Sequence, residues 1–129
     1  MGIHRRTAAK MLAGFGLSVT AMPAFAQAKT VEVSMGRAKM VFLPAVTKIS
    51  VGDTVNWTNP AVVQHSVTFD PSMAVKPGNV VLPEGVAPFD SGEMEQDATF
   101  SHTFTVKGTY KYVCKLHEAM GMIGTVIVA

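Results

Sequence analysis

Five side chains with soft or nitrogen donor atoms are placed so that one metal ion could use four of them. Cys114-Lys-Leu-His117 is followed by Met120 and Met122, and His65 lies upstream in an apolar stretch. Thiolate and thioether are soft ligands and imidazole is intermediate. This set therefore suits copper, which cycles between the +1 and +2 states, and two His, one Cys and a weak axial Met are typical of an electron-transfer site.

Each of these residues also has an ordinary structural role when it is taken alone. A free Cys is often a small buried hydrophobe; His117 could be a surface loop residue, and His65 a hydrogen-bonded core histidine. The spacing favours a joint role in binding one copper ion. Cys114 is the only Cys in the chain, so it cannot form an internal disulfide. His102 is not a candidate, since it lies between Phe100 and Phe104 in the middle of an expected strand.

The first 26 residues have the features of a secretory signal peptide. Arg5-Arg6 and Lys10 give a basic start, an apolar run follows from Met11 to Met22, and small residues precede Gln27. We expect cleavage before Gln27 and a periplasmic location. The arginine pair resembles a twin-arginine signal; the alternative is an ordinary Sec signal with a chance arginine pair.

Removing 26 of the 129 residues leaves 103, enough for one domain over residues 27–129. This part has 8 basic and 9 acidic side chains, hence a formal charge of −1. It has no basic patch with interleaved aromatic residues, so we expect no nucleic-acid partner. It has no apolar segment long enough for a membrane span. We expect a small monomer without disulfides, held together by an ordinary core.

The pattern of residues 27–129 predicts an all-β protein. Short stretches rich in Val, Thr, Phe and Tyr alternate in polarity and are separated by Gly and Pro, which is typical of a sandwich or barrel. The expected strands are Thr30–Met35, Thr54–Trp57, Ser66–Phe69, Thr99–Val106, Thr109–Cys114 and Ile123–Val128. Residues 71–97 contain four prolines and are expected to be mostly loop, with Val80–Leu82 as a candidate short strand.

Side-chain alternation predicts where the expected donors point. Tyr110, Tyr112 and Cys114 share one face of their strand, and Lys111, Val113 and Lys115 share the other, so Cys114 should point inward. Met122 begins an inward row that continues through Gly124, Val126 and Val128. The end of one strand and the start of the next would then hold a metal between rigid elements.

The chain resembles the small cupredoxins of the plastocyanin, pseudoazurin and amicyanin kind. The resemblance covers nearly all of residues 27–129 and is most specific in Cys114-Lys-Leu-His117 followed by Met122-Ile-Gly124-Thr-Val126. It implies a Greek-key β-sandwich, with His65, Cys114, His117 and Met122 as the copper ligands. Met122 is preferred to Met120 as the axial ligand because Gly124 and Val126 follow it. Ser66 stands where the family more often has an Asn that links the two ligand loops.

The expected function is one-electron transfer between periplasmic redox proteins, without an enzymatic activity. Partners would be a cytochrome or a copper- or quinone-containing enzyme, docking near His117. Apolar residues are expected around that histidine: Leu116, Ala119 and Met120 from one loop, and Pro60, Ala61, Val62 and Val63 from another. Two alternatives remain. A copper enzyme would need further histidines for catalytic copper, and a copper chaperone or storage protein would favour an exchangeable site without a buried thiolate.

Overall fold

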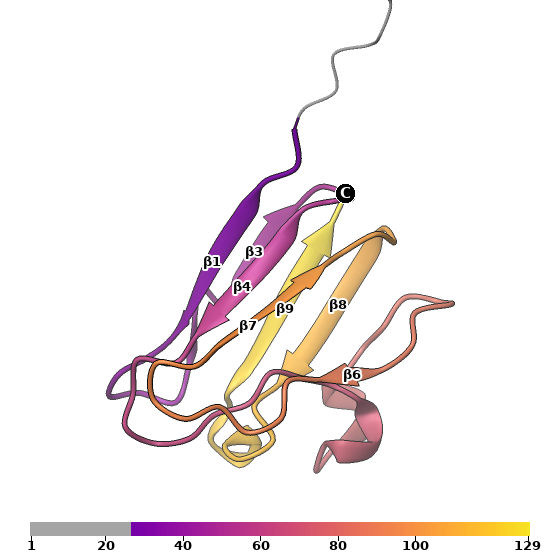
Figure 1. Ribbon diagram of the computed structural model, residues 1–129. Helices are drawn as coiled ribbons and strands as arrows, with labels where there is room; N and C mark the ends of the chain where they lie inside the picture. Colours follow the sequence, from indigo (N-terminus) through magenta and orange to yellow (C-terminus); the bar gives the residue numbers. More distant parts are fainter. Residues whose placement is uncertain (1–26) are drawn as a thin grey trace, which may run out of the picture.

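The computed structural model describes residues 27–129, so the expected signal peptide over residues 1–26 lies outside the described residues. The described chain forms two β-sheets packed face to face (Figure 1), and the predicted all-β Greek-key sandwich is confirmed as the fold class. In the described part, no helix is long and apolar enough to cross a membrane.

One sheet has four strands in the order β2-β1-β4-β7. β1 (Thr30–Met35) pairs in parallel with β4 (Thr54–Thr58) and antiparallel with β2 (Phe42–Leu43), while β7 (Thr99–Thr103) runs antiparallel to β4. Alternate residues of β1 and β4 are buried, as expected when one face of a sheet covers a core.

The second sheet has five strands in the order β3-β9-β8-β5-β6. The long central pair is β8 (Gly108–Val113) and β9 (Ile123–Val128), which run antiparallel, and β3 (Val46–Ile49) lies parallel to β9. The other edge is formed by the short strands β5 and β6, which span Thr68–Phe69 and Phe89–Asp90. Residues 27–129 also contain three 3₁₀ helices: η2 (Pro71–Met73), η3 (Pro77–Asn79) and η4 (Glu118–Met120).

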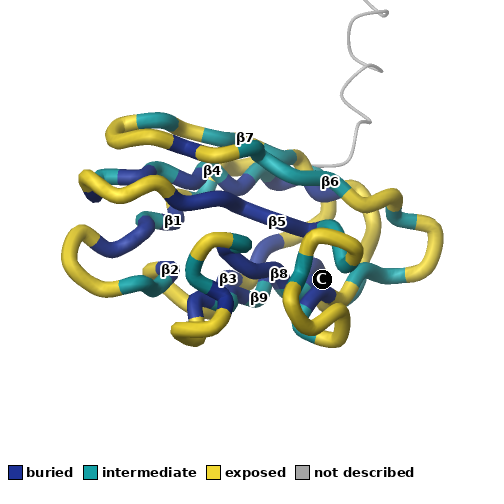
Figure 2. Tube along the Cα trace, turned by 90° about the horizontal axis from the view of Figure 1, so that it is seen from below, coloured by how far each residue is buried: buried dark blue, intermediate teal, exposed yellow. Residues whose placement is uncertain are grey.

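Aromatic rings fill the space between the sheets. Figure 2 shows the buried residues of the strands in dark blue. Trp57 of β4 and Tyr112 of β8 are fully buried, and the indole Nε1–H of Trp57 donates a hydrogen bond of 3.0 Å to the Tyr112 hydroxyl. Phe69 stacks on Tyr112 with ring centroids 4.7 Å apart. This contact network joins both sheets next to β8, the strand that directly precedes Cys114, so it limits movement of that strand.

Most predicted strands are confirmed, with differences at the ends. β1 and β9 have the expected bounds, but β5 is shorter than expected and β7 ends at Thr103 instead of Val106. Beyond Thr103 the chain turns to the β3–β4 connection, where Phe104 N–H donates to the Asp53 carbonyl. The sequence did not indicate β2, β3 or β6. Val80–Leu82 contributes only an isolated bridge, between Val81 and Lys111.

The residues that β8 points into the core were predicted correctly. Tyr110, Tyr112 and Cys114 are buried, and so are Met122, Gly124 and the inward valines of β9. Val113, expected on the outer face with the lysines, is also fully buried. Around it, β5 pairs with Val113 at Thr68, Val81 forms a bridge with Lys111, and η3 contacts β8.

Candidate metal centre

Three donor atoms predicted for the site converge at the end of the sandwich where β4 and β8 finish and β9 begins (Figure 1). Nδ1 of His65 lies 3.2 Å from Nδ1 of His117. The Cys114 Sγ atom lies 3.7 Å from Nδ1 of His65 and 3.5 Å from Nδ1 of His117. Residues 49 and 52 positions apart in the chain thus point their donors at one spot.

The spacing of these atoms fits a transition-metal ion. A point equidistant from the three lies about 2 Å from each, close to the nitrogen–metal and sulfur–metal bond lengths known for zinc. A cation at this point would be bound by the Nδ1 lone pairs of both imidazoles, which requires the tautomer of each ring that carries its hydrogen on Nε2. Two imidazole nitrogens with one thiolate are the donor set that blue-copper sites use.

Burial favours the form of the His65 side chain that binds metal. His65 and Cys114 are fully buried, while His117 is partly exposed and brings the site to the surface. Burial lowers the pKa of His65, and the neighbouring His117 lowers it further. A neutral His65 imidazole keeps its Nδ1 lone pair free for a metal, because protonation and ligation compete for it.

Consecutive turns fix the loop that carries Cys114 and His117. Cys114 N–H donates to the Met122 carbonyl at 3.0 Å, and His117 N–H donates to the Cys114 carbonyl at 3.1 Å. Gly121 ends η4 in the left-handed region, with φ of 86°, and so turns the chain into β9.

The two candidate axial residues differ sharply in exposure. Met122 is fully buried and belongs to the same core cluster as Cys114. Met120 is 68% exposed. A thioether ligand has to point into the protein beside the other donors, so these positions support Met122, and the fourth ligand stays a prediction.

Ser66 links the two loops through a directed chain of hydrogen bonds. Its N–H donates to Cys114 Sγ at 3.3 Å, and its hydroxyl accepts from Lys115 N–H at 2.9 Å. Thr68 donates its hydroxyl hydrogen to the Asp90 carboxylate, so the 2.8 Å contact between the Ser66 and Thr68 hydroxyls must be donated by Ser66. Asp90 also pairs with the Lys115 ammonium at 3.4 Å. Sequence patterns gave no sign of this chain of hydrogen bonds.

Asn59 organises the loop before His65, and sequence reasoning missed it as well. Its amide donates to the carbonyls of Val63 and Met94, and its carbonyl accepts from Ala61 N–H. His65 itself exchanges backbone hydrogen bonds with Met94. Ala61 was expected to be exposed, and this is wrong, because the Asn59 bond folds it inward to 3% exposure.

His102, the remaining histidine of the described chain, lies apart from the three converging donors. It belongs to β7, and its ring stacks on Phe89 with centroids 3.8 Å apart. Burial lowers its pKa. Its place agrees with the expectation that it is not a ligand.

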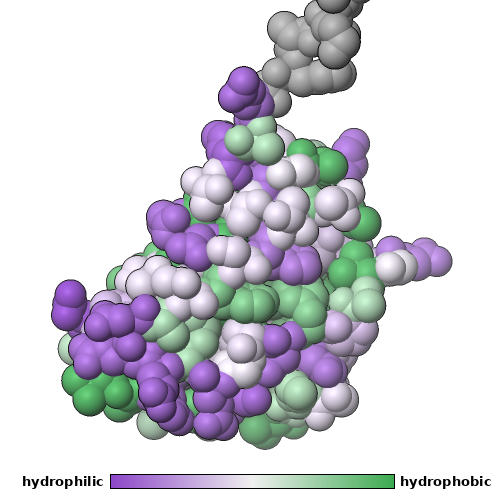
Figure 3. Space-filling view, in the orientation of Figure 1, coloured by the Kyte–Doolittle hydropathy of each residue, from purple (hydrophilic) through white to green (hydrophobic). Residues whose placement is uncertain are grey.

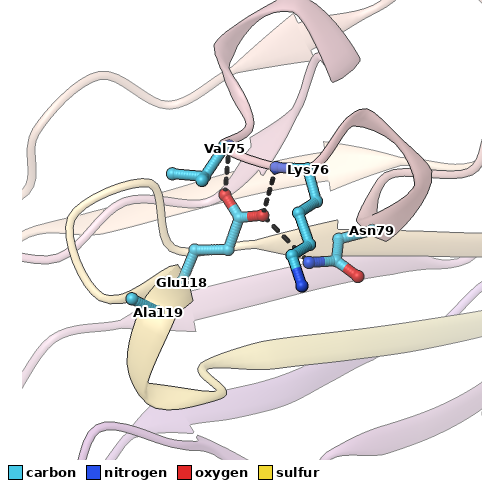
Figure 4. A pocket seen from close by; sticks show the side chains of 5 residues that line it. All are labelled: Val75, Lys76, Asn79, Glu118 and Ala119. Atoms are coloured by element: carbon cyan, nitrogen blue, oxygen red, sulfur yellow. Dashed lines mark hydrogen bonds between the residues drawn. The ribbon is translucent and has the colours of Figure 1, made fainter.

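Glu118, directly after His117, is buried although it carries a charge (Figure 4). It borders a pocket of about 270 Å³ lined by Val75, Lys76, Asn79 and Ala119. Burial alone would raise the pKa of its carboxyl. The hydrogen bonds it accepts from Lys76 N–H, Asn79 and Val75 N–H outweigh that effect and hold the pKa below its usual value.

Comparisons with known proteins agree with this geometry. Residues 29–129 match the family described as copper binding proteins, plastocyanin/azurin family. Plastocyanin of Vicia faba is 36% identical over 104 residues, covering 76% of this chain and 99% of that protein. Chloroplastic plastocyanin of Tetradesmus obliquus is 31% identical over 124 residues, covering 91% and 74%.

Solved structures give the same result. A Cu(I) amicyanin variant superposes with a TM-score of 0.61 at 33% identity, covering 78% of this chain and 82% of that one. A purple cupredoxin from Nitrosopumilus maritimus shares the fold, with a TM-score of 0.59 at 24% identity, covering 77% and 99%.

Proposed function

This chain belongs to the plastocyanin/azurin family of copper-binding proteins and is a type 1 copper cupredoxin, and from that premise we propose that it is a one-electron carrier. We propose further that His65, Cys114, His117 and Met122 hold its copper ion. The observation that carries the proposal is the convergence of the buried Cys114 thiol with Nδ1 of His65 and His117.

Copper, when bound, supplies a one-electron couple between its +1 and +2 states. The residues around the site hold the ligands in the same positions in both oxidation states. Cys114 is joined by backbone hydrogen bonds to both His117 and Met122, and its sulfur accepts a hydrogen bond from Ser66 N–H. Full burial of His65, Cys114 and Met122 excludes water from their side of the site. Hydrogen bonds to the sulfur and burial are also the means by which a protein sets a metal's potential.

The visible spectrum and voltammetry of the copper-loaded protein test this function. An electron carrier should show an intense thiolate-to-copper absorption band and a reversible one-electron wave. A chaperone or storage protein should instead give a weakly coloured adduct that gives up its copper readily, and that result would overturn the proposal. An enzyme with a second, catalytic copper would bind more than one equivalent of metal.

We propose that residues 1–26 direct export to the periplasm and are removed before Gln27. The basic start and the apolar run support this, and the match to the family covers only residues 29–129. Expression of the full chain in a Gram-negative host should yield periplasmic protein whose mass corresponds to residues 27–129. Recovery of protein that retains residues 1–26 would contradict the proposal.

Electron exchange would take place at the end of the molecule where His117 approaches the surface. Exposed apolar side chains border this end: Val62, Val63, Leu116, Ala119 and Met120, here called the apolar end. In Figure 3, hydrophobic surface appears at the lower end of the molecule in separate areas among hydrophilic side chains. Exposed apolar patches mark interaction sites, and transient redox complexes use small interfaces. A redox protein such as a cytochrome or a copper- or quinone-containing enzyme is the proposed partner, with this chain acting as a monomer.

Charge placed in the apolar end should slow electron exchange. Val62 is 81% exposed, so Val62→Asp and Ala119→Asp should leave the fold and the visible spectrum unchanged. Each should slow electron self-exchange of the copper-loaded protein about tenfold or more, because the contact must then desolvate a charge. NMR line broadening in mixtures of the oxidised and reduced protein measures this rate.

Val51→Asp is the matched control, because Val51 is exposed and lies in the turn at the opposite end of the sandwich. It adds the same net charge and should change self-exchange much less. Equal slowing in all three variants would mean that net charge, and not the apolar end, controls the rate.

A further inference from the structure

Glu118 is an unusual residue to find buried next to an expected metal ligand. Carboxylates are rarely buried unless they are fully compensated. Only 6% of this residue is exposed, and η4, to which it belongs, is a single turn that joins Cys114 and His117 to β9. An apolar residue would fill the same space without a desolvation cost. The buried charge at this position therefore indicates a role for the Glu118 carboxylate in the site.

The Glu118 carboxylate is fully engaged by a separate segment of the chain. Oε1 accepts from Val75 N–H at 2.7 Å, and Oε2 accepts from Lys76 N–H at 3.0 Å and from the Asn79 side-chain amide at 2.9 Å. Figure 4 shows the side chain reaching from η4 to residues 75–79. Hydrogen bonds to an ionised acceptor are shorter and stronger than neutral ones, so the contact ties two loops firmly together.

The orientation of the His117 ring depends on how firmly its backbone is held. Metal-binding histidines usually donate their other ring N–H to a protein group that fixes the ring. In residues 27–129, the hydrogen-bonding contacts of the His117 ring are those of Nδ1, toward His65 and Cys114. No outer group of the described chain holds Nε2. The orientation of the ring therefore depends on the backbone of His117, whose carbonyl accepts from Met120 and Met122 within the η4 turn.

We propose that Glu118 is a positioning residue of the metal centre, which clamps the His117 loop to residues 75–79 and so holds the His117 ring toward His65 and Cys114. The inference rests on the proposed ligand role of His117. The clamp limits movement of this most exposed ligand when copper changes its charge. It also resists dissociation of His117 from the reduced copper ion. Without the clamp, such a movement would open the site at the protein surface.

The test compares Glu118→Gln with Asp53→Asn. Asp53 is also a buried carboxylate that accepts two backbone N–H groups, from Lys29 and Ser50, but it lies in the turn before β4, at the other end of the sandwich. Both variants replace one carboxylate oxygen by a donor and should lower thermal stability. In the copper-loaded protein, only Glu118→Gln should accelerate transfer of Cu(I) to a chelator, by about tenfold or more. It should also shift the reduction potential and speed amide hydrogen exchange at Val75 and Lys76.

Asn79→Ala keeps the carboxylate and removes one of its three donors, so it should accelerate copper transfer in the same direction by a smaller factor. This variant keeps the test decisive if Glu118→Gln does not fold. Copper transfer and potential in Glu118→Gln and Asn79→Ala that match those of Asp53→Asn would overturn the positioning role and leave only a structural one. Failure of the unmodified protein to show a thiolate-to-copper band would instead overturn the proposed function itself.

Discussion

Replacing Cys114 by serine is expected to abolish the intense visible absorption of the copper-loaded protein. Only a thiolate supplies a low-energy charge transfer to copper in this donor set, and Cys114 is the only Cys in the chain. A serine hydroxyl is a hard and weakly acidic ligand, poorly matched to Cu(I). We expect complete loss of the band and of the reversible redox wave, measured by absorption spectroscopy and voltammetry after copper loading.

The fold should survive this substitution. Serine is close to cysteine in size, and its hydroxyl can accept the hydrogen bond that Ser66 N–H donates to Sγ. We expect a loss of about 1–3 kcal/mol for burying a hydroxyl with incomplete hydrogen bonding, and an unchanged far-ultraviolet circular dichroism spectrum. A persistent intense band in folded Cys114→Ser protein would refute the thiolate assignment.

The methionines provide the comparison within the same site. Met122→Ala should keep the band and the copper but shift the potential, because a weak axial ligand tunes the metal without creating the colour. Met120→Ala removes a side chain that is 68% exposed and should change the potential much less. A larger shift for Met120→Ala would mean that the axial assignment is wrong.

The sequence predicted best those elements whose pattern depends only on their own residues. β1 and β9 alternate over six residues each, and their bounds were predicted correctly. β2 and β6 have two residues each, too few for alternation, and are defined by their pairing with β1 and with the equally short β5. Val113 shows the same limit, since alternation gives the face on which a residue lies but not what later covers that face.

The predicted donors were found together because their chemistry is unusual in combination. A lone Cys, a His three residues later and a Met beyond it carry their signal in type and spacing. The residues that hold them carry no such signal. Ser66, Thr68 and Asp90 form one hydrogen-bonded chain only because β5, β6 and the end of β8 are adjacent in space. Glu118 is likewise an ordinary loop residue until residues 75–79 fold against it.

Gly124→Ala is expected to destabilise the protein strongly, although it adds only one methyl group. Gly124 pairs across the sheet with Tyr112, and its position is buried. A Cβ atom there would lie less than 3.0 Å from Cζ, Oη and Cε1 of the Tyr112 ring. That ring cannot move freely, since it stacks on Phe69 and its hydroxyl accepts from Trp57. The glycine that follows Met122 in the motif is therefore required by the volume of Tyr112.

We expect Gly124→Ala to cost at least about 3 kcal/mol, the sum of overpacking and a weakened Trp57–Tyr112 hydrogen bond. For a domain of this size, that corresponds to a fall in Tm of about 15 °C. Thermal unfolding of the metal-free protein measures it without any contribution from copper. Gly78→Ala is the control, because a Cβ there meets nothing within 4 Å, and it should change stability by less than about 0.5 kcal/mol.

A double-mutant cycle identifies the cause of the Gly124→Ala effect. Tyr112→Leu removes the atoms that the new methyl would strike, so most of the cost of Gly124→Ala should disappear in that background. An unchanged cost would show that the glycine is needed for its backbone and not for the space above it. If the cycle shows the expected coupling, one contact sets both the packing of the core and the distance between β8 and β9. Since Cys114 lies two residues after Tyr112 and Met122 two residues before Gly124, the same contact fixes where these two proposed ligands begin their approach to the metal.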